Sequence, residues 1–127
     1  MRLHYQSVGK GEPLVILHGL FGSSDNWRSI ASALSAKRQV ISVDLRNHGQ
    51  SFHHPQQNFE LMAEDLLNLL DELELPTIDL MGHSLGGKTA MQFVQTFADR
   101  VRRLIVVDIA PRQYHDEHSI IFKALMA

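Results

Sequence analysis

The sequence predicts an α/β fold in which a mostly parallel sheet carries helices on both faces. Uninterrupted apolar runs at residues 14–17 and 104–107 are typical of strands that are buried on both sides of a parallel sheet, and the mainly apolar run at residues 78–81 predicts a further strand. An amphipathic segment at residues 59–73 places apolar side chains at helical spacing between the first two runs. Strands that alternate with amphipathic helices indicate a parallel sheet covered by helices.

Shorter elements complete the first half of this pattern. Residues 3–7 alternate apolar and polar side chains, which predicts a short half-exposed strand. Ser24 or Asp25 can cap a helix that continues to Leu34. Residues 40–43 then provide another apolar strand.

The second half continues the alternation. Asn58 can cap the helix at residues 59–73, and Pro76 is expected to end it. Apolar periodicity predicts further helices at residues 89–97 and 120–126. The acidic residues of the 59–73 helix and its end are expected to face solvent: Glu64, Asp65, Asp71, Glu72 and Glu74.

Composition narrows the classes of protein that fit. The chain has 127 residues, which corresponds to one domain, and its 44% of hydrophobic residues argues against disorder. A net charge of −2 gives no reason to expect a nucleic-acid partner. The absence of cysteine excludes disulfides and thiolate metal sites. We expect a cytoplasmic protein with no membrane span, no metal and no cofactor.

The stretch Gly82-His83-Ser84-Leu85-Gly86 has the pattern Gly-x-Ser-x-Gly between a predicted strand and a predicted helix. This is the layout of a nucleophile elbow, a sharp turn that exposes a serine hydroxyl. The turn brings the strand and helix backbones so close that side chains at the two glycine positions would collide. The pattern therefore predicts that Ser84 is a nucleophile, held in a strained conformation with φ > 0.

Other polar loops follow the predicted strands in the same way. Residues 19–22, residues 44–51, Ser84 and Asp108 each come directly after a strand. Because the carboxyl ends of parallel strands meet at one edge of the sheet, we expect these loops to form one site.

Four segments carry a resemblance to a known family. His18-Gly19-Leu20-Phe21-Gly22-Ser23, Asp44-Leu45-Arg46-Asn47-His48-Gly49-Gln50-Ser51, Gly82-His83-Ser84-Leu85-Gly86-Gly87-Lys88 and Val107-Asp108-Ile109-Ala110-Pro111 occur in this order. Together they resemble the α/β-hydrolase superfamily, and within it the YbfF-like small esterases. The resemblance implies hydrolysis of small acyl esters or acyl thioesters by a Ser–His–Asp triad, without a cofactor.

The same resemblance assigns roles to particular residues. Ser84 matches the nucleophile, and Asp108 matches the triad acid. Leu20 or Phe21 would supply one backbone amide of the oxyanion hole, and Leu85 would supply the other. The chain order of Ser84 before Asp108 agrees with the Ser…Asp…His order of the superfamily.

Two alternatives remain open for the other triad positions. Asp44 rivals Asp108 as the acid, although a strand-end aspartate followed by Arg46 is more often part of an ion pair that orders a loop. His115 and His118 are candidates for the base or for a pair of metal ligands, but no supporting pattern surrounds them.

By the resemblance, residues 1–127 correspond to the N-terminal part of a single α/β-hydrolase core domain, truncated after the strand that ends at Asp108. The lid, the C-terminal strands and the catalytic histidine are expected to lie outside the chain. The strand at residues 104–107, otherwise expected to be buried on both faces, would then form a sheet edge. The alternative to an esterase is a non-catalytic fragment or binding module that uses this edge, with self-association as one outcome.

Overall fold

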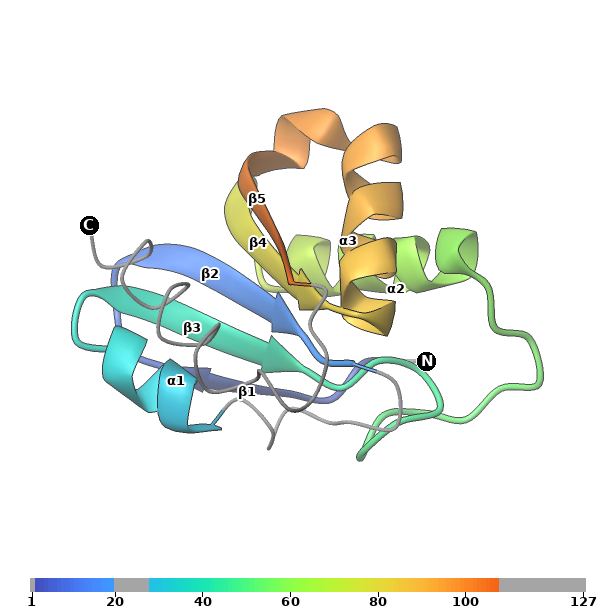
Figure 1. Cartoon of the computed structure of the whole chain (residues 1–127), viewed down its shortest axis with the longest axis horizontal. Helices are drawn as coiled ribbons and strands as arrows, with labels where there is room; N and C mark the ends of the chain where they lie inside the picture. Colours follow the sequence, from blue (N-terminus) through green and yellow to red (C-terminus); the bar gives the residue numbers. More distant parts are fainter. Residues whose placement is uncertain (1, 20–27, 108–127) are drawn as a thin grey trace.

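The computed structural model of the chain describes residues 2–19 and 28–107. These residues form a five-stranded sheet in the order β1-β3-β2-β4-β5 (Figure 1). Strand β1 pairs with β3 antiparallel, and the other neighbouring strands run parallel. The predicted fold class is therefore confirmed. The elements are β1 (Tyr5–Val8), β2 (Glu12–Leu17), α1 (Arg28–Leu34), β3 (Arg38–Val43), α2 (Phe59–Glu72), β4 (Ile78–His83), α3 (Leu85–Thr96), the 3-10 helix η2 (Ala98–Arg100) and β5 (Val101–Val107).

Helices cover both faces of the sheet, as predicted (Figure 1). Leu14 and Ile16 of β2 pack in one apolar cluster with residues of α1. The alternate residues of β2, Val15 and Leu17, pack in a second cluster with residues of α2 and α3. Because side chains alternate along a strand, this division explains why the whole run at residues 14–17 is apolar.

The termini of α2 differ in how well the sequence predicts them. Asn58 caps the helix as expected, since its Oδ1 accepts a hydrogen bond from the N–H of Leu61 at 2.8 Å. The expectation that Pro76 ends the helix is wrong, because the helix has already ended at Glu72. Glu74 adopts φ 58°, and the N–H of Leu75 donates to the carbonyl of Leu70 at 2.9 Å. These two features form a Schellman C-cap with glutamate at the position that glycine usually takes.

The prediction that residues 104–107 are buried on both faces is also wrong. Leu104 and Val106 are 37% and 40% exposed. Strand β5 pairs with β4 and is the last strand on that side of the described sheet. The expectation that this strand forms an edge is thus confirmed for the described part of the chain.

A buried charge interrupts the apolar run of β4. Asp79 is 1% exposed, and its Oδ2 accepts hydrogen bonds from Arg38 at 2.6 Å and Arg102 at 3.3 Å. Arg102 lies at the position where the register between β4 and β5 shifts. The ion pairs compensate the desolvation of the carboxylate at the amino ends of the parallel strands, opposite the edge where Ser84 lies.

No helix in the described ranges has the length and apolar character that crossing a bilayer requires.

Candidate active site

Ser84 forms the turn between β4, which ends at His83, and α3, which begins at Leu85. Its backbone angles are φ 54° and ψ −112°. A non-glycine residue in this region is strained, and such strain is often retained where it positions a functional group. The predicted elbow geometry is confirmed, including the positive φ and the immediate start of the helix.

The glycines of the motif allow the elbow to pack against its neighbours. A Cβ atom on Gly82 would lie 2.3 Å from the carbonyl oxygen of Gly86. A Cβ atom on Gly86 would lie 2.3 Å from the carbonyl oxygen of Leu17, in β2. Both distances are far below van der Waals contact, so the tight turn and its close approach to β2 require glycine at these positions.

Backbone hydrogen bonds fix the elbow on both sides. The N–H of Ser84 donates to the carbonyl of Val107 in β5 at 3.0 Å. The N–H of Gly86 donates to the carbonyl of His18, just beyond β2, at 3.0 Å. Ser84 is therefore held between the two neighbouring strands and does not depend on its own side chain for position.

The hydroxyl of Ser84 is not used to cap the helix. Serine is a favoured N-cap residue, yet here the side chain makes no capping hydrogen bond, and the residue is exposed. An N-cap residue normally has extended backbone angles, which Ser84 does not adopt. The strained backbone thus presents the hydroxyl to solvent at the carboxyl edge of the sheet.

His18 is a buried structural histidine whose two ring nitrogens are both engaged. Nε2 accepts a hydrogen bond from the N–H of Leu45 at 3.0 Å, so Nδ1 carries the proton and donates to the carbonyl of Gly19 at 2.7 Å. Burial lowers the pKa of His18, which keeps the ring neutral. His18 therefore holds two loops in place, because it connects the loop after β2 to the loop after β3.

Gly19 and His48 pack beside this histidine. A Cβ atom on Gly19 would lie 2.7 Å from Nδ1 of His83, so the ring of His83 lies against the start of the loop after β2. The ring of His48 lies 5.0 Å from that of His18. Its Nδ1 is 2.9 Å from the carbonyl of Arg46 and donates to it.

Asp44 lies at the end of β3 with a buried carboxylate that orders the following loop. Its Oδ2 accepts hydrogen bonds from Nδ1 of His4 at 2.9 Å and from the N–H of Gln50 at 3.0 Å. A Cβ atom on Gly49 would lie 2.4 Å from the carboxylate carbon, so the loop folds tightly around it. These contacts support the structural role that the sequence favoured for Asp44, but the side chain that bonds its carboxylate is that of His4 and not that of Arg46.

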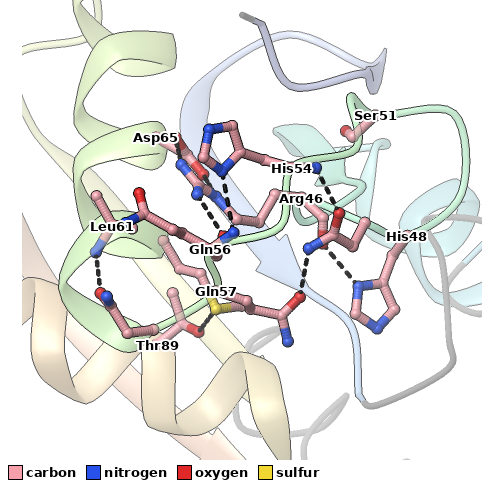
Figure 2. A network of polar contacts seen from close by, with 12 residues as sticks. Arg46, His48, Ser51, His54, Gln56, Gln57, Leu61, Asp65 and Thr89 are labelled. Carbon is pink, nitrogen blue, oxygen red and sulfur yellow. Dashed lines mark hydrogen bonds and ion pairs between the residues drawn. The ribbon is translucent and has the colours of Figure 1, made fainter.

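Arg46 instead pairs with Asp65 of α2 (Figure 2). Its Nε and Nη2 donate to the two carboxylate oxygens at 2.6 and 2.8 Å, and Nη1 donates to the carbonyl of Gln56 at 2.8 Å. The hydrogen bond with Asp65 raises the pKa of Arg46. The expectation that Asp65 belongs to the solvent face of α2 is wrong, since its side chain is only 12% exposed.

Asn47 ties the same loop to its own continuation. It adopts φ 66°, and its side chain bonds Gln57 at 2.9 Å and the N–H of His54 at 2.8 Å. Together with the Arg46–Asp65 pair, this fixes residues 45–57 against α2. Sequence reasoning missed His4 and Asp65 because neither lies in a recognisable motif.

Five candidate site residues lie outside the described residues: Leu20, Phe21, Asp108, His115 and His118. Their roles therefore stay predictions. Leu85 is the first residue of α3, where a backbone N–H lacks a partner within the helix, as the oxyanion role requires.

A sheet of this topology with a strained serine between strand and helix defines an α/β hydrolase. The model of the α/β hydrolase fold family matches residues 12–126, and the chain belongs to this family. It is 41% identical over 123 residues to esterase YbfF of Escherichia coli, a match that covers 96% of this chain and 48% of that protein. It is 50% identical over 100 residues to the sn-1-specific diacylglycerol lipase ABHD11 of Mus musculus, covering 77% of this chain and 33% of that protein.

Solved structures agree with these relatives. A marine microorganism esterase aligns with a TM-score of 0.83 at 44% identity, over 99% of this chain and 51% of that one. The chain thus spans about half of that esterase and less than half of the two curated relatives. The resemblance to YbfF-like esterases is confirmed.

Proposed function

We propose that the protein is a serine hydrolase that cleaves small carboxylic esters or acyl thioesters through an acyl-enzyme on Ser84. The observation that carries this proposal is the strained, exposed serine at φ 54°, whose hydroxyl makes no capping bond. The names of the relatives, an esterase and a lipase, support ester bonds as the substrate class.

The reaction has two steps, acylation of Ser84 and hydrolysis of the acyl-enzyme, and each step forms one bond to the acyl carbon and breaks another. The Oγ of Ser84 attacks the acyl carbon while a base removes its proton, and the alcohol or thiol leaves with that proton. Water then attacks the acyl-enzyme and releases the acid, which restores the serine. No cofactor takes part in either step.

Negative charge develops on the carbonyl oxygen during both steps. In the proposal, the N–H of Leu85 donates one hydrogen bond to this oxygen, and the loop after Gly19 donates another through Leu20 or Phe21. The hydrogen bond from Gly86 to His18 supports this arrangement, because it holds the start of α3 next to the start of that loop.

We place the catalytic histidine outside residues 1–127 and assign Asp108 as its acid. Several described histidines already have other partners: His4 bonds Asp44, His18 bonds Gly19 and Leu45, and His48 bonds Arg46. The order of the motifs, with Ser84 before Asp108, supports a histidine that follows both.

The test is labelling with a fluorophosphonate, which reacts with activated serines, followed by peptide mass spectrometry. The protein translated from the complete reading frame should be labelled on Ser84 and should hydrolyse a short acyl ester. Ser84→Ala should lose both properties and keep the circular dichroism spectrum of the wild type. Labelling on another serine, or turnover that survives in Ser84→Ala, would refute the proposal.

The second candidate is a non-catalytic module that associates through β5. The exposed apolar side chains of Leu104 and Val106 favour it, because an edge strand with such residues is a site for pairing with another chain. Sedimentation velocity on the 127-residue chain tests it: dimers that Val106→Lys dissociates would support the module, whereas a monomer at all concentrations would exclude self-association.

A further inference from the structure

Lys88 is a cation close to the proposed nucleophile in the chain. It is the one charged residue in the sequence of α3, and it lies in the first turn of that helix. Lys88 is exposed, and within the described part of the chain it takes part in no ion pair.

The geometry of the helix places Lys88 one turn from Ser84. The N–H of Lys88 donates to the carbonyl of Ser84 at 3.0 Å, so the two residues are one helical turn apart. Four residues along a helix correspond to a rise of about 6 Å, which is within reach of a lysine side chain. Side chains on a helix lean toward its N-terminus, which directs the long Lys88 side chain back toward the serine.

This position is unfavourable for helix stability. The N-terminus of a helix carries partial positive charge, and carboxylates are the side chains that stabilise the first turn. Here the first turn has no acidic residue and has a lysine in its place. The charge is also not needed for packing, since Lys88 is exposed.

We propose that Lys88 binds an anionic group of the substrate, such as a phosphate, sulfonate or carboxylate, about one helical turn from the ester bond. The inference rests on the proposed function of Ser84 and adds a substrate class to it. An ammonium beside the nucleophile that no described carboxylate neutralises favours an ester with negative charge over a neutral ester of the same shape.

Matched pairs of esters test this inference in the protein translated from the complete reading frame. The first pair places the charge on the leaving group: 4-acetoxybenzenesulfonate and its neutral sulfonamide. The second places it on the acyl group: the mono-4-nitrophenyl ester of adipic acid and 4-nitrophenyl hexanoate. The pair that shows the effect identifies the part of the substrate that lies near Lys88.

Lys88→Gln should lower kcat/KM for the anionic member of one pair about three- to tenfold, as expected for one unit charge roughly 6–8 Å away at high effective dielectric. The neutral member should be unaffected, and Lys88→Arg should retain the preference. In ~1 M NaCl, where the Debye length is about 3 Å, the wild type should lose most of its preference. Lys37→Gln, at an exposed lysine just before β3 and thus at the opposite edge of the sheet, is the matched control and should change neither rate.

Equal rates of wild type and Lys88→Gln on both anionic esters, with turnover that still depends on Ser84, would overturn this inference and leave the esterase proposal intact. If the wild type showed no Ser84-dependent turnover of any of these esters, both this inference and the esterase proposal would be overturned. An equal loss on charged and neutral esters would show that Lys88 acts on structure and not on charge recognition.

Discussion

Substitution of Gly86 by alanine tests whether close packing of the elbow on β2 requires glycine. A Cβ atom at this position would lie 2.3 Å from the carbonyl oxygen of Leu17 and 2.6 Å from that of His18. Both contacts are with backbone atoms of a central strand and its end, so no side chain can rotate away. The start of α3 must therefore move away from β2 by about 0.7 Å or more to restore contact distances.

Three contributions set the size of the effect. Overpacking of this kind costs about 1–3 kcal/mol. Displacement of the helix also weakens the hydrogen bond from Gly86 to His18, which contributes about 0.5–1.5 kcal/mol. The higher helix propensity of alanine offsets about 0.8–1.0 kcal/mol. We expect Gly86→Ala to lower the free energy of unfolding by about 1–3 kcal/mol.

Urea denaturation followed by circular dichroism measures this change, and Gly87→Ala is the matched control. A Cβ atom on Gly87 would lie 3.0 Å from Cγ1 of Val106, whose half-exposed side chain can move. It would also lie 3.2 Å from the carbonyl oxygen of Gly82, a contact that a shift of a few tenths of an ångström relieves. The control should therefore lie within about 0.5 kcal/mol of the wild type. If Gly86→Ala were as stable as Gly87→Ala, the packing argument for the motif would be wrong.

Four further predictions concern the backbone of Ser84, the end of α2, the triad acid and the protonation of His18. Ser84→Gly should be more stable than Ser84→Ala by about 1 kcal/mol in urea denaturation, because glycine adopts φ 54° without strain; equal midpoints would show that the backbone is not strained. Glu74→Gly should raise the free energy of unfolding by about 0.5–1 kcal/mol through a relaxed C-cap, and a decrease would contradict the assigned Schellman motif. Asp108→Asn should lower kcat by several orders of magnitude, whereas Asp44→Asn should mainly lower the urea midpoint of unfolding. A larger loss of kcat in Asp44→Asn than in Asp108→Asn would make Asp44 the triad acid. Burial lowers the pKa of His18 below its ordinary value of 6.5, so at low pH the unfolded chain binds a proton there that the native protein does not. The free energy of unfolding should therefore fall as the pH drops below about 6.5, and His18→Gln should flatten this dependence. An unchanged slope in His18→Gln would contradict a neutral His18.

The sequence by itself determined the features whose causes are local. Period-2 and period-3.6 apolar patterns identified the described strands and helices within a few residues of their observed bounds, and the helix predicted at residues 120–126 lies outside the described residues. The elbow was predictable for the same reason, since the collision that excludes a Cβ at Gly82 involves Gly86, four residues away in the same motif. Asn58 as the cap of α2 is another such feature, because a cap bonds a residue three positions ahead.

Only the tertiary structure decided which charged groups meet. Asp44 pairs with His4, 40 residues earlier, and Arg46 pairs with Asp65, 19 residues later. Many carboxylates in the chain were equally plausible partners, and the choice depends on how the loop after β3 lies against β1 and α2. Local proximity in sequence therefore gave the wrong partner for Arg46.

The end of α2 and the exposure of β5 were decided in the same way. Arg100, which follows α3, donates to the carbonyls of Leu75 and Pro76 and to the carboxylate of Asp71, and so holds the chain where Glu74 turns it out of the helix. Strand β5 has the apolar composition of a central strand but lies at the side of the described sheet. Composition records which side chains favour burial, whereas the order of the strands determines which of them obtain it.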